Sequence, residues 1–307
     1  MDVTDGTPDA ALGIGDLAGL TGVPVRTIRF YCDEGILEPG RSAGGHRRFD
    51  RSAVDRLRLV RRLRGLGLGL PAIAAVLTGD RSLGEAVAAQ RAALDVELAA
   101  LSWRRASLRA VEDAGPAERA ARLELLAVAE DGAAARDALA AFWRRLVLVP
   151  APADLALTFV SMGVPEPPAD PTPEQVLAYA EMVALVGDRT LTRRLLARGR
   201  ANVEEVREEK TLLTGLGEAI VMALPRVLAG EEPGPGEPLD RFVEAHAVVR
   251  GRRDTPGFRR ALLPRVVADG DPRLRRYWDL FGVVTGERVT GGAAHIWLVD
   301  ALGRSAG

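Results

Sequence analysis

The sequence has little of several residue types on which whole classes of function depend. It contains a single cysteine, Cys32, which excludes an internal disulfide and a cysteine-based zinc site. Its three histidines, His46, His246 and His295, lie far apart and lack the spacing of paired metal ligands. We therefore expect no metal and no cofactor.

Long apolar runs and a secretory leader are also lacking. The apolar runs, such as 146–149, are much shorter than the roughly 20 residues that a membrane span needs. The first eleven residues carry Asp2, Asp5 and Asp9 and no basic residue, which is unlike a secretory signal. We expect a cytoplasmic protein without membrane contact, beginning with a flexible acidic tail at 1–11.

The charges of the chain are unevenly distributed. With 47% hydrophobic and 27% charged residues, the 307-residue chain has the composition of a folded protein of about two domains. Eleven arginines and six carboxylates lie between Leu12 and Thr78, although the net charge of the whole chain is only −1. Such a segment predicts a polyanionic partner for that part of the chain alone.

Glycine and proline divide this basic segment into short elements. Apolar residues over 14–20 have the spacing of a short helix, and Pro24 can occupy the first turn of a second helix over 25–34. Because a glycine-containing turn joins the two, they predict a helix-turn-helix. Residues 35–49 are rich in glycine and proline, which favours a wing or hairpin, and Asp50 can cap a third helix.

The segment 82–113 predicts one long helix, since it contains no proline and a single glycine. Its leucine-rich positions recur every seven residues, as in the seam of a coiled coil. The expected dimerisation residues are Val87, Leu94, Leu98, Leu101 and Leu108. Polar residues at the companion positions leave open the alternative of an amphipathic helix packed on its own domain.

The remainder of the chain has a helical pattern almost throughout. Gly115 and Pro116 mark the expected boundary. Capping residues followed by proline predict helices that begin after Thr172, Thr255 and Asp271. One apolar stripe over 203–227 predicts a long helix.

Several motifs of the first hundred residues occur together in a specific order. They are Ile14 to Tyr31 (IGDLAGLTGVPVRTIRFY), Gly35-Ile-Leu, Gly45-His-Arg-Arg-Phe49 and the leucine-rich stretch 57–70. With this spacing the sequence resembles the MerR family of transcriptional regulators over about residues 12–113. The resemblance implies a winged helix-turn-helix followed by a long helix that pairs antiparallel with its twin in a homodimer.

The predicted fold class is therefore mainly α. It comprises a winged helix-turn-helix DNA-binding domain over 12–80, a long antiparallel coiled-coil dimerisation helix over 81–114, and an all-helical effector-binding domain over 115–307.

Basic and hydroxyl side chains of the second helix and the wing are the expected DNA contacts. Arginine binds guanine edges or phosphates in bidentate fashion, and Thr and Tyr hydroxyls donate to phosphates. The expected set is Val25, Arg26, Thr27, Arg29, Tyr31, His46, Arg47, Arg48, Arg61 and Arg64. For Arg61 and Arg64, a solvated basic face is an equal alternative. This sequence has His46 and Phe49 where the family usually has tyrosines, so Phe49 lacks a hydroxyl for a phosphate.

The resemblance also implies a mechanism. Members of the family bind a pseudo-palindromic operator within a promoter spacer, and effector binding makes the dimer bend and untwist that spacer. The two promoter elements then become aligned for RNA polymerase. The expected partners are double-stranded promoter DNA, RNA polymerase, a second copy of the chain and a small organic effector.

Many of the few aromatic residues lie in the helical region 115–307, which has no cysteine. A partly apolar organic effector is therefore expected there, with an ordinary core as the alternative for each residue. The candidate pocket residues are Trp143, Phe159, Tyr179, His246, Tyr277, Trp278 and Phe281, and His295 is an alternative polar anchor to His246.

Catalytic motifs are not apparent in the sequence. No Ser-His-Asp or Cys-His set stands out, and the glycine-rich turns follow no strand, so we expect no enzymatic activity. Two alternatives to an effector-responsive activator remain. The chain could be a repressor whose C-terminal domain binds a protein, or a DNA-binding head fused to an enzymatic or drug-sequestering module.

Overall fold

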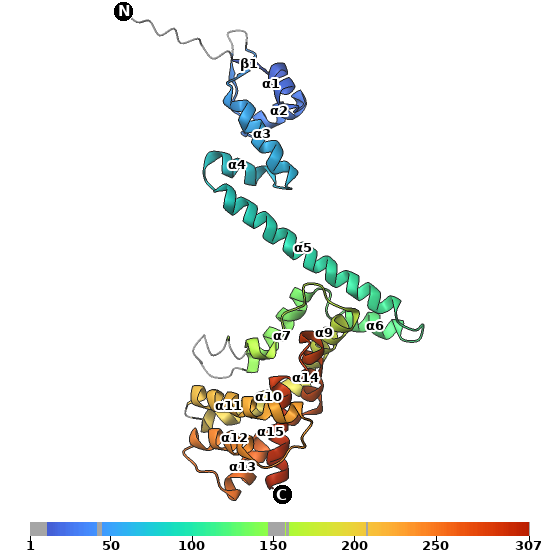
Figure 1. Ribbon diagram of the computed structural model, residues 1–307, viewed down its shortest axis with the longest axis vertical. Coiled ribbons are helices and arrows are strands. Elements are labelled where there is room, and N and C mark those ends of the chain that lie inside the picture. The colour runs from blue at the N-terminus through green and yellow to red at the C-terminus, as the bar shows by residue number, and fades with distance from the viewer. Residues whose placement is uncertain (1–10, 42–44, 147–156, 158–159, 207, 307) are drawn as a thin grey trace, which may run out of the picture. The chain divides into compact units, whose positions relative to one another are not determined.

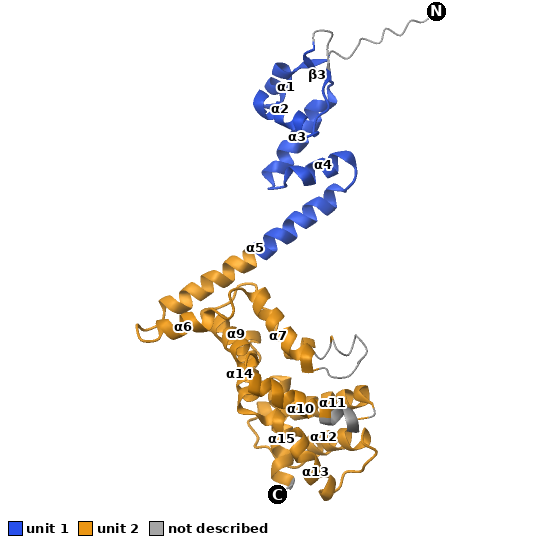
Figure 2. Cartoon of the chain, turned by 180° about the vertical axis from the view of Figure 1, so that it is seen from behind, with its two compact units in different colours: residues 1–97 blue, residues 98–307 orange. Residues whose placement is uncertain are grey.

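The computed structural model describes residues 11–41, 45–146, 157, 160–206 and 208–306 (Figure 1). The chain is mainly α, as predicted, and it divides into two compact units, residues 1–97 and 98–307 (Figure 2). Each unit has its own buried apolar core. The expected acidic tail, apart from Ala11, and the candidate pocket residue Phe159 lie outside the described residues.

The first unit combines short helices with a small sheet. Its elements are β1 (Leu12–Gly13), α1 (Ile14–Thr21), α2 (Val25–Asp33), β2 (Gly40–Arg41), β3 (Arg47–Phe49), α3 (Ser52–Gly65), α4 (Leu70–Thr78) and the first part of α5 (Leu83–Glu112). The strands lie in the order β1-β3-β2, and both pairs are antiparallel. The predicted wing is therefore the β2-β3 hairpin, and β1 adds a third strand that the sequence did not indicate.

Local capping explains where α1 ends and where α3 begins. Gly22 has φ 67°, a left-handed conformation that favours glycine, and its N–H donates to the Ala18 carbonyl at 2.8 Å. The Asp50 carboxylate accepts a hydrogen bond from Ser52 Oγ at 2.6 Å and from the Ala53 N–H at 3.0 Å. Asp50 thus caps α3 as predicted. The bond from Ser52 lowers the pKa of the Asp50 carboxyl.

Apolar side chains from α1, α2 and α3 meet in the core of the first unit. Leu17, Ile28 and Leu57 are fully buried, and Phe49 of the wing packs with them. A second cluster around Val60 joins α3 to α4 and to the start of α5. The inner side of α2 is thereby fixed, which leaves its outer side exposed to solvent.

The second unit contains the rest of α5 and a set of helices without strands among the described residues. These are α6 (Arg119–Leu126), α7 (Gly132–Leu146), α9 (Pro173–Val186), α10 (Arg189–Glu205), α11 (Glu209–Leu228), α12 (Glu237–Val248), α13 (Pro256–Val266), η1 (Val267–Gly270), α14 (Pro272–Thr285) and α15 (Gly291–Ala306). The side chains of Thr172, Thr255 and Asp271 cap α9, α13 and α14, so those three predicted helix starts are confirmed.

The second unit begins within α5, at Leu98, rather than near Gly115 as the sequence suggested. Trp103, Ala106 and Ala110 of α5 are buried in the core of this unit. The Trp103 indole Nε1 also donates to the Ala129 carbonyl at 3.1 Å. Packing of this half of the helix therefore moves the boundary into α5.

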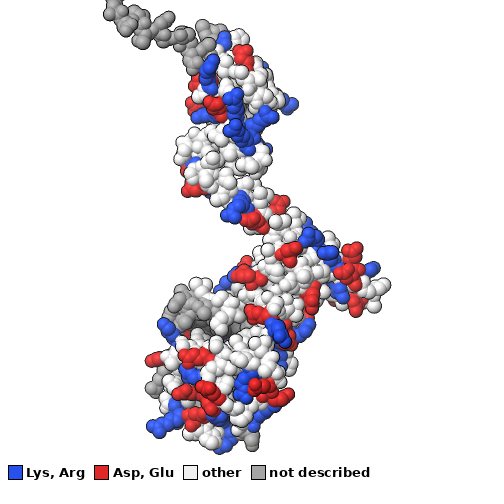
Figure 3. Space-filling view, in the orientation of Figure 1, with Lys and Arg blue, Asp and Glu red and all other residues white. Residues whose placement is uncertain are grey.

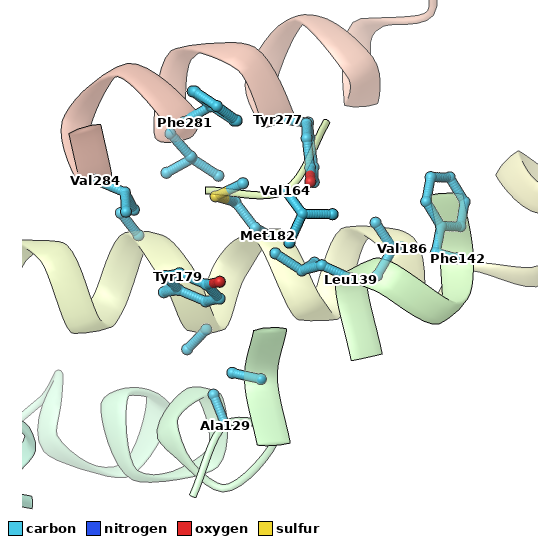
Figure 4. Close-up of a cluster of buried hydrophobic side chains, with 14 of the residues drawn as sticks. Ala129, Leu139, Phe142, Val164, Tyr179, Met182, Val186, Tyr277, Phe281 and Val284 are labelled. Atoms are coloured by element: carbon cyan, nitrogen blue, oxygen red, sulfur yellow. The ribbon is translucent and has the colours of Figure 1, made fainter. Parts of the chain in front are cut away.

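Two large apolar clusters form most of the core of the second unit, and a small third cluster surrounds Leu212. The largest one joins α5, α6, α7, α9, α10 and α14, and Figure 4 shows Tyr277, Phe281 and Val284 of one helix reaching towards Tyr179 and Met182 of another. The other large cluster joins α11, α12, α13 and α15, which lie side by side in Figure 1.

The expected single helix over 203–227 is wrong, because the chain leaves the helical conformation between α10 and α11. Glu208 is extended, with φ −139° and ψ 94°, and its carboxylate accepts a hydrogen bond from Thr211 Oγ1 at 2.8 Å. The apolar stripe gave no sign of this break.

Within the described part of the chain, α11 is the one helix that is both long enough and apolar enough to cross a membrane. Its length and a mean hydropathy of 1.4 would suffice to cross a bilayer. One side of α11 packs in the second apolar cluster, where Ala219 and Ala223 are fully buried. Packing of this kind is common to core helices of globular domains, so the composition of α11 alone is weak support for a span.

Close packing of α14 on α15 yields the first prediction. A Cβ added at Gly292 would lie 1.9 Å from Cδ2 of the Trp278 indole, whereas one added at Gly217 of α11 meets nothing within 4 Å. Gly292→Ala should lower the free energy of unfolding by about 1–3 kcal/mol because the indole must move. Gly217→Ala, the matched control, should raise it by up to about 1 kcal/mol. Urea unfolding followed by tryptophan fluorescence measures both, and equal stabilities of the two variants would contradict the packing.

Candidate nucleic-acid interface and effector domain

Helix α2 presents two arginines on its solvent-exposed side. Arg26 and Arg29 are exposed, one turn apart, while Ile28 between them is fully buried. Val25 and Thr27 are half-buried. Because α2 is anchored from its other side, the two guanidinium groups are free to approach the edge of a duplex.

Tyr31 has a more structural position than its predicted role suggests. It is half-buried and packs against both apolar clusters of the first unit. Its backbone carbonyl accepts hydrogen bonds from the N–H groups of Ile36 and Leu37, at 2.9 and 3.2 Å. Tyr31 therefore contributes to the turn that leads from α2 into the wing.

The wing arginines already have partners within the first unit. Arg47 Nη2 donates to Asp33 Oδ1 at 2.9 Å, and its Nη1 is buried without a hydrogen-bond partner. Arg48 Nη1 donates to the Ala11 carbonyl at 3.2 Å, and His46 is exposed. Sequence reasoning missed Asp33, because nothing in the motif pairs the end of α2 with a side chain fourteen positions later.

Arg61 and Arg64 bind backbone carbonyls. Arg61 Nη1 donates to the Thr21 carbonyl at 3.2 Å, and Arg64 Nη1 donates to the Leu68 carbonyl at 2.8 Å. The first bond ties α3 to the turn of the helix-turn-helix, and the second closes the turn after α3. Both arginines thus have a local structural role in addition to any contact with a phosphate.

Positive charge gathers on residues 12–78 of the first unit. Figure 3 shows arginines clustered on the visible face of this unit, whereas basic and acidic side chains alternate over the visible face of the second unit. This distribution matches the excess of arginine over carboxylate between Leu12 and Thr78. A polyanion would be attracted to residues 12–78, the basic part of this unit, by the field of these charges.

Helix α5 carries apolar side chains on two opposite sides. Trp103, Ala106 and Ala110 point into the core of the second unit. Successive residues of a helix lie about 100° apart around its axis, and this spacing places a second set of apolar residues on the side of α5 opposite Trp103. The members of this apolar strip are exposed in the chain: Leu83, Val87, Leu94, Leu98, Leu101 and Leu108. Sequence analysis identified all of them except Leu83.

Four predicted effector residues come together in the second unit. Trp143 of α7 lies within ring-contact distance of Tyr277 and Trp278 of α14, and Trp278 in turn contacts Phe281. The Trp143 indole donates to Tyr277 Oη at 2.9 Å, and Tyr277 Oη donates to the Gly163 carbonyl at 2.6 Å. Burial raises the pKa of the Tyr277 hydroxyl. The rings are tightly packed against the backbone of Gly163, since a Cβ at this position would lie 2.6 Å from the Trp143 ring.

Tyr179 belongs to the same core but has other neighbours. It stacks edge to face on Trp103, with centroids 5.5 Å apart, and its hydroxyl donates to the Pro165 carbonyl at 2.7 Å. Burial raises the pKa of this hydroxyl as well.

His246 lies apart from the aromatic cluster, in a buried polar group on the α12 side. Its ring contacts Phe242, which also contacts His295, so the two candidate histidine anchors lie around one phenylalanine. His295 Nε2 lies 3.2 Å from the Asp269 carboxylate, to which Arg198 Nη1 donates at 2.7 Å. Sequence analysis missed Asp269 and Arg198, because their contact depends on folding of α10 against η1.

The charges in this group act on its ionisable members. Burial, assisted by the positive charge of Arg250, lowers the pKa of His246 to about 3. Burial alone would raise the pKa of Asp269, but the charge of Arg198 and the hydrogen bond with His295 outweigh it and lower the pKa. His246 is therefore neutral at physiological pH, with Nδ1 facing Arg250 Nη1 at 3.1 Å and Nε2 buried without a partner.

The low pKa of His246 predicts a pH-dependent stability. Below pH 6.5, the ordinary pKa of histidine, His246 of the unfolded chain binds a proton that His246 of the folded chain does not bind. The free energy of unfolding should therefore decrease as the pH is lowered, by at most about 1.4 kcal/mol per pH unit. The loss ends near pH 3, where the folded form is protonated too. His246→Gln should remove this component of the profile. Urea unfolding from pH 7 to pH 5, followed by tryptophan fluorescence, measures it; identical profiles would contradict the assignment.

Comparison with known proteins agrees with this geometry. Residues 12–80 match the model of the MerR HTH family regulatory proteins. Nodulation protein NolA of Bradyrhizobium sp. (strain NC92) is 38% identical over 97 residues, 31% of this chain and 41% of that protein. The HTH-type transcriptional activator TipA of Streptomyces coelicolor is 45% identical over 65 residues, 21% of this chain and 26% of that protein.

An HTH-type transcriptional regulator of Pseudomonas aeruginosa is 33% identical over 105 residues, which cover 33% of this chain and 74% of that protein. No solved structure matches the chain. The chain spans about two fifths of the length of the nodulation proteins that it matches. The 105-residue match to the Pseudomonas regulator is about as long as the first unit together with the rest of α5, and it covers nearly three quarters of that protein. The chain belongs to the MerR family of helix-turn-helix transcriptional regulators.

Proposed function

We propose that the chain is an effector-responsive transcription regulator that binds a promoter spacer as a homodimer and activates transcription by distorting it. The observation that carries the proposal is the exposed apolar strip of α5. Leu98 and Leu108 are 63% and 66% exposed, and every residue from 91 to 101 is exposed. A helix that has water on all sides over three turns gains little from its own chain, so a partner must bury this strip.

A second copy of the chain is the partner that best suits the strip. Its residues recur with the spacing of a coiled-coil seam, and family resemblance implies antiparallel pairing of two such helices. Each dimer then carries two copies of α2, each with Arg26 and Arg29 exposed. Two linked readers bind a site with two half-sites far more tightly than one. Twofold symmetry of the protein also requires a pseudo-palindromic operator.

The proposed activation depends on the cost of deforming DNA. Bending and untwisting a promoter spacer costs on the order of 1–6 kcal/mol. An effector can stabilise the distorted complex only if it binds that conformation more tightly by a comparable free energy. The second unit, with about two thirds of the residues and two large apolar clusters, is the candidate for this effector-binding role.

The dimer is tested by charges placed in the strip. Leu94→Glu with Leu101→Glu should yield a monomer, because four carboxylates would have to be buried in the paired helices. The control is Ala92→Glu with Ala99→Glu, which adds the same charge to exposed positions on the other side of α5. Sedimentation velocity measures the mass of each variant. A dimer of the Leu94/Leu101 variant would place the interface elsewhere.

The DNA contacts are tested on a duplex selected from a random pool by the unaltered chain. Arg29→Ala should cost about 1–3 kcal/mol of binding and relax sequence preference at one position in each half-site.

Arg47→Ala should weaken binding to all duplexes alike and reduce the slope of the salt dependence by about one unit for each phosphate that the variant no longer binds. Arg260→Ala on α13 of the second unit removes an equal charge from an exposed position and should leave both unchanged. An unchanged salt slope for Arg47→Ala would remove it from the phosphate contacts.

A further inference from the structure

The second unit has an open hollow whose rim is formed by arginine side chains. It lies between α10 and the segment α13-η1 and has a volume of about 440 Å³, within the usual range of small-molecule sites. Arg194 and Arg198 of α10 and Arg265 of α13 line it, and Ala197, Pro264 and Val267 form its apolar part. Val267 is about half exposed at the edge of this apolar part.

Two buried carboxylates hold the α10 arginines in place at this rim. Arg194 Nη1 contacts Asp271 at 3.0 Å, and Arg198 Nη1 contacts Asp269 at 2.7 Å. Asp269 and Asp271 are almost completely buried, whereas the side chain of Arg194 is 60% exposed. The negative groups thus lie beneath the surface and the positive groups lie at it.

Arg194, whose side chain is largely exposed, keeps donors available for a ligand. A guanidinium group has five N–H donors, and among the described contacts Arg194 uses Nη1 alone. Arg198 Nε is buried without a hydrogen-bond partner. Asp271 is also shared with Arg273, which donates to it from Nη2 at 2.8 Å and to Asp188 from Nη1 at 2.7 Å.

We propose that this hollow binds the carboxylate of a small organic acid, with the apolar part of the acid against Ala197, Pro264 and Val267. The planar fork of a guanidinium matches a carboxylate in bidentate geometry, and the partly desolvated surroundings strengthen such a bond. The inference rests on the proposed function, for which it names the chemical class of the effector.

Other candidate sites in the second unit fit an anion less well. The hollow beside α12 is lined by four carboxylates, Glu237, Asp240, Glu244 and Asp254, which would repel an anion despite three neighbouring arginines. The aromatic cluster around Trp143 is tightly packed at Gly163, where an added Cβ would lie 2.6 Å from the Trp143 ring, and its four aromatic side chains carry no positive charge for an anion.

A bound acid would act directly on contacts that join several helices. Asp271 caps α14, the helix that carries Tyr277 and Trp278. Asp269 joins Arg198 of α10 to His295 of α15. A ligand carboxylate that binds Arg194 and Arg198 competes with these buried aspartates, so occupancy would redistribute the ion pairs that hold α10, α14 and α15 together.

The test uses the full chain and probes of matched shape. Isothermal titration with sodium benzoate and octanoate should detect binding, and benzamide and octanamide, which lack the charge, should bind at least about tenfold more weakly. Arg265→Gln, which leaves the buried aspartates paired with Arg194 and Arg198, should weaken benzoate binding by about tenfold. Arg193→Gln removes a charge next to Arg194 on α10 but outside the hollow, and it should not alter benzoate affinity.

Several results would overturn the inference: no binding of either acid, equal binding of acid and amide, no effect of Arg265→Gln, or inorganic phosphate binding as tightly as benzoate. None of these affects selection of a duplex by the chain, which tests the proposed function separately. A chain that binds benzoate through Arg265 but selects no duplex would support the site and overturn the regulatory function.

Discussion

The organisation of this chain depends on one helix that must bury two opposite apolar sides. The chain itself covers only one of them: Trp103 and Ala110 of α5 are packed in the second unit, while Leu98 and Leu108 remain in water. Burial of each leucine is worth about 1.5–3 kcal/mol, so an exposed strip of this length strongly favours association. Pairing of α5 is therefore the step on which the proposed two-site grip on DNA depends.

Within the first unit, the same side chains stabilise the fold and are placed for recognition. Arg61 and Arg64 bind backbone carbonyls at the two turns that fix the positions of α1, α3 and α4. Arg47 is held by Asp33 at the end of α2. In the proposed complex, a phosphate would compete with or share these partners, and DNA binding would therefore depend on the local conformation of the wing. Among the described contacts, the side chains of Arg26 and Arg29 form no hydrogen bond or ion pair within the first unit.

The sequence allowed much of the fold to be predicted, because local signals determined it. Asp50, Thr172 and Thr255 cap helices, and in each case a short polar side chain before an apolar helical pattern indicates the start of the helix. The single helix over 203–227 was wrong because the apolar stripe keeps its helical spacing across Glu208, where the backbone is extended.

The contacts of the candidate sites were harder to predict. The pairing of Arg47 with Asp33, and the group formed by Arg198, Asp269 and His295, join residues that are separated along the chain. Aromatic residues indicated a pocket around Trp143, yet the structure fills that region with the rings themselves and opens a hollow beside arginines instead. The sequence shows where the few aromatic residues lie along the chain, but only the packing of the helices determines whether they line a pocket or fill the core.

The central claim, a paired α5 that presents two α2 helices to one duplex, is tested most directly by the stoichiometry of the DNA complex. Sedimentation equilibrium of the unaltered chain with a duplex chosen from a random pool should give two chains per duplex, and footprinting should give two protected half-sites related by inverted symmetry. One chain per duplex with a single protected half-site would contradict the account.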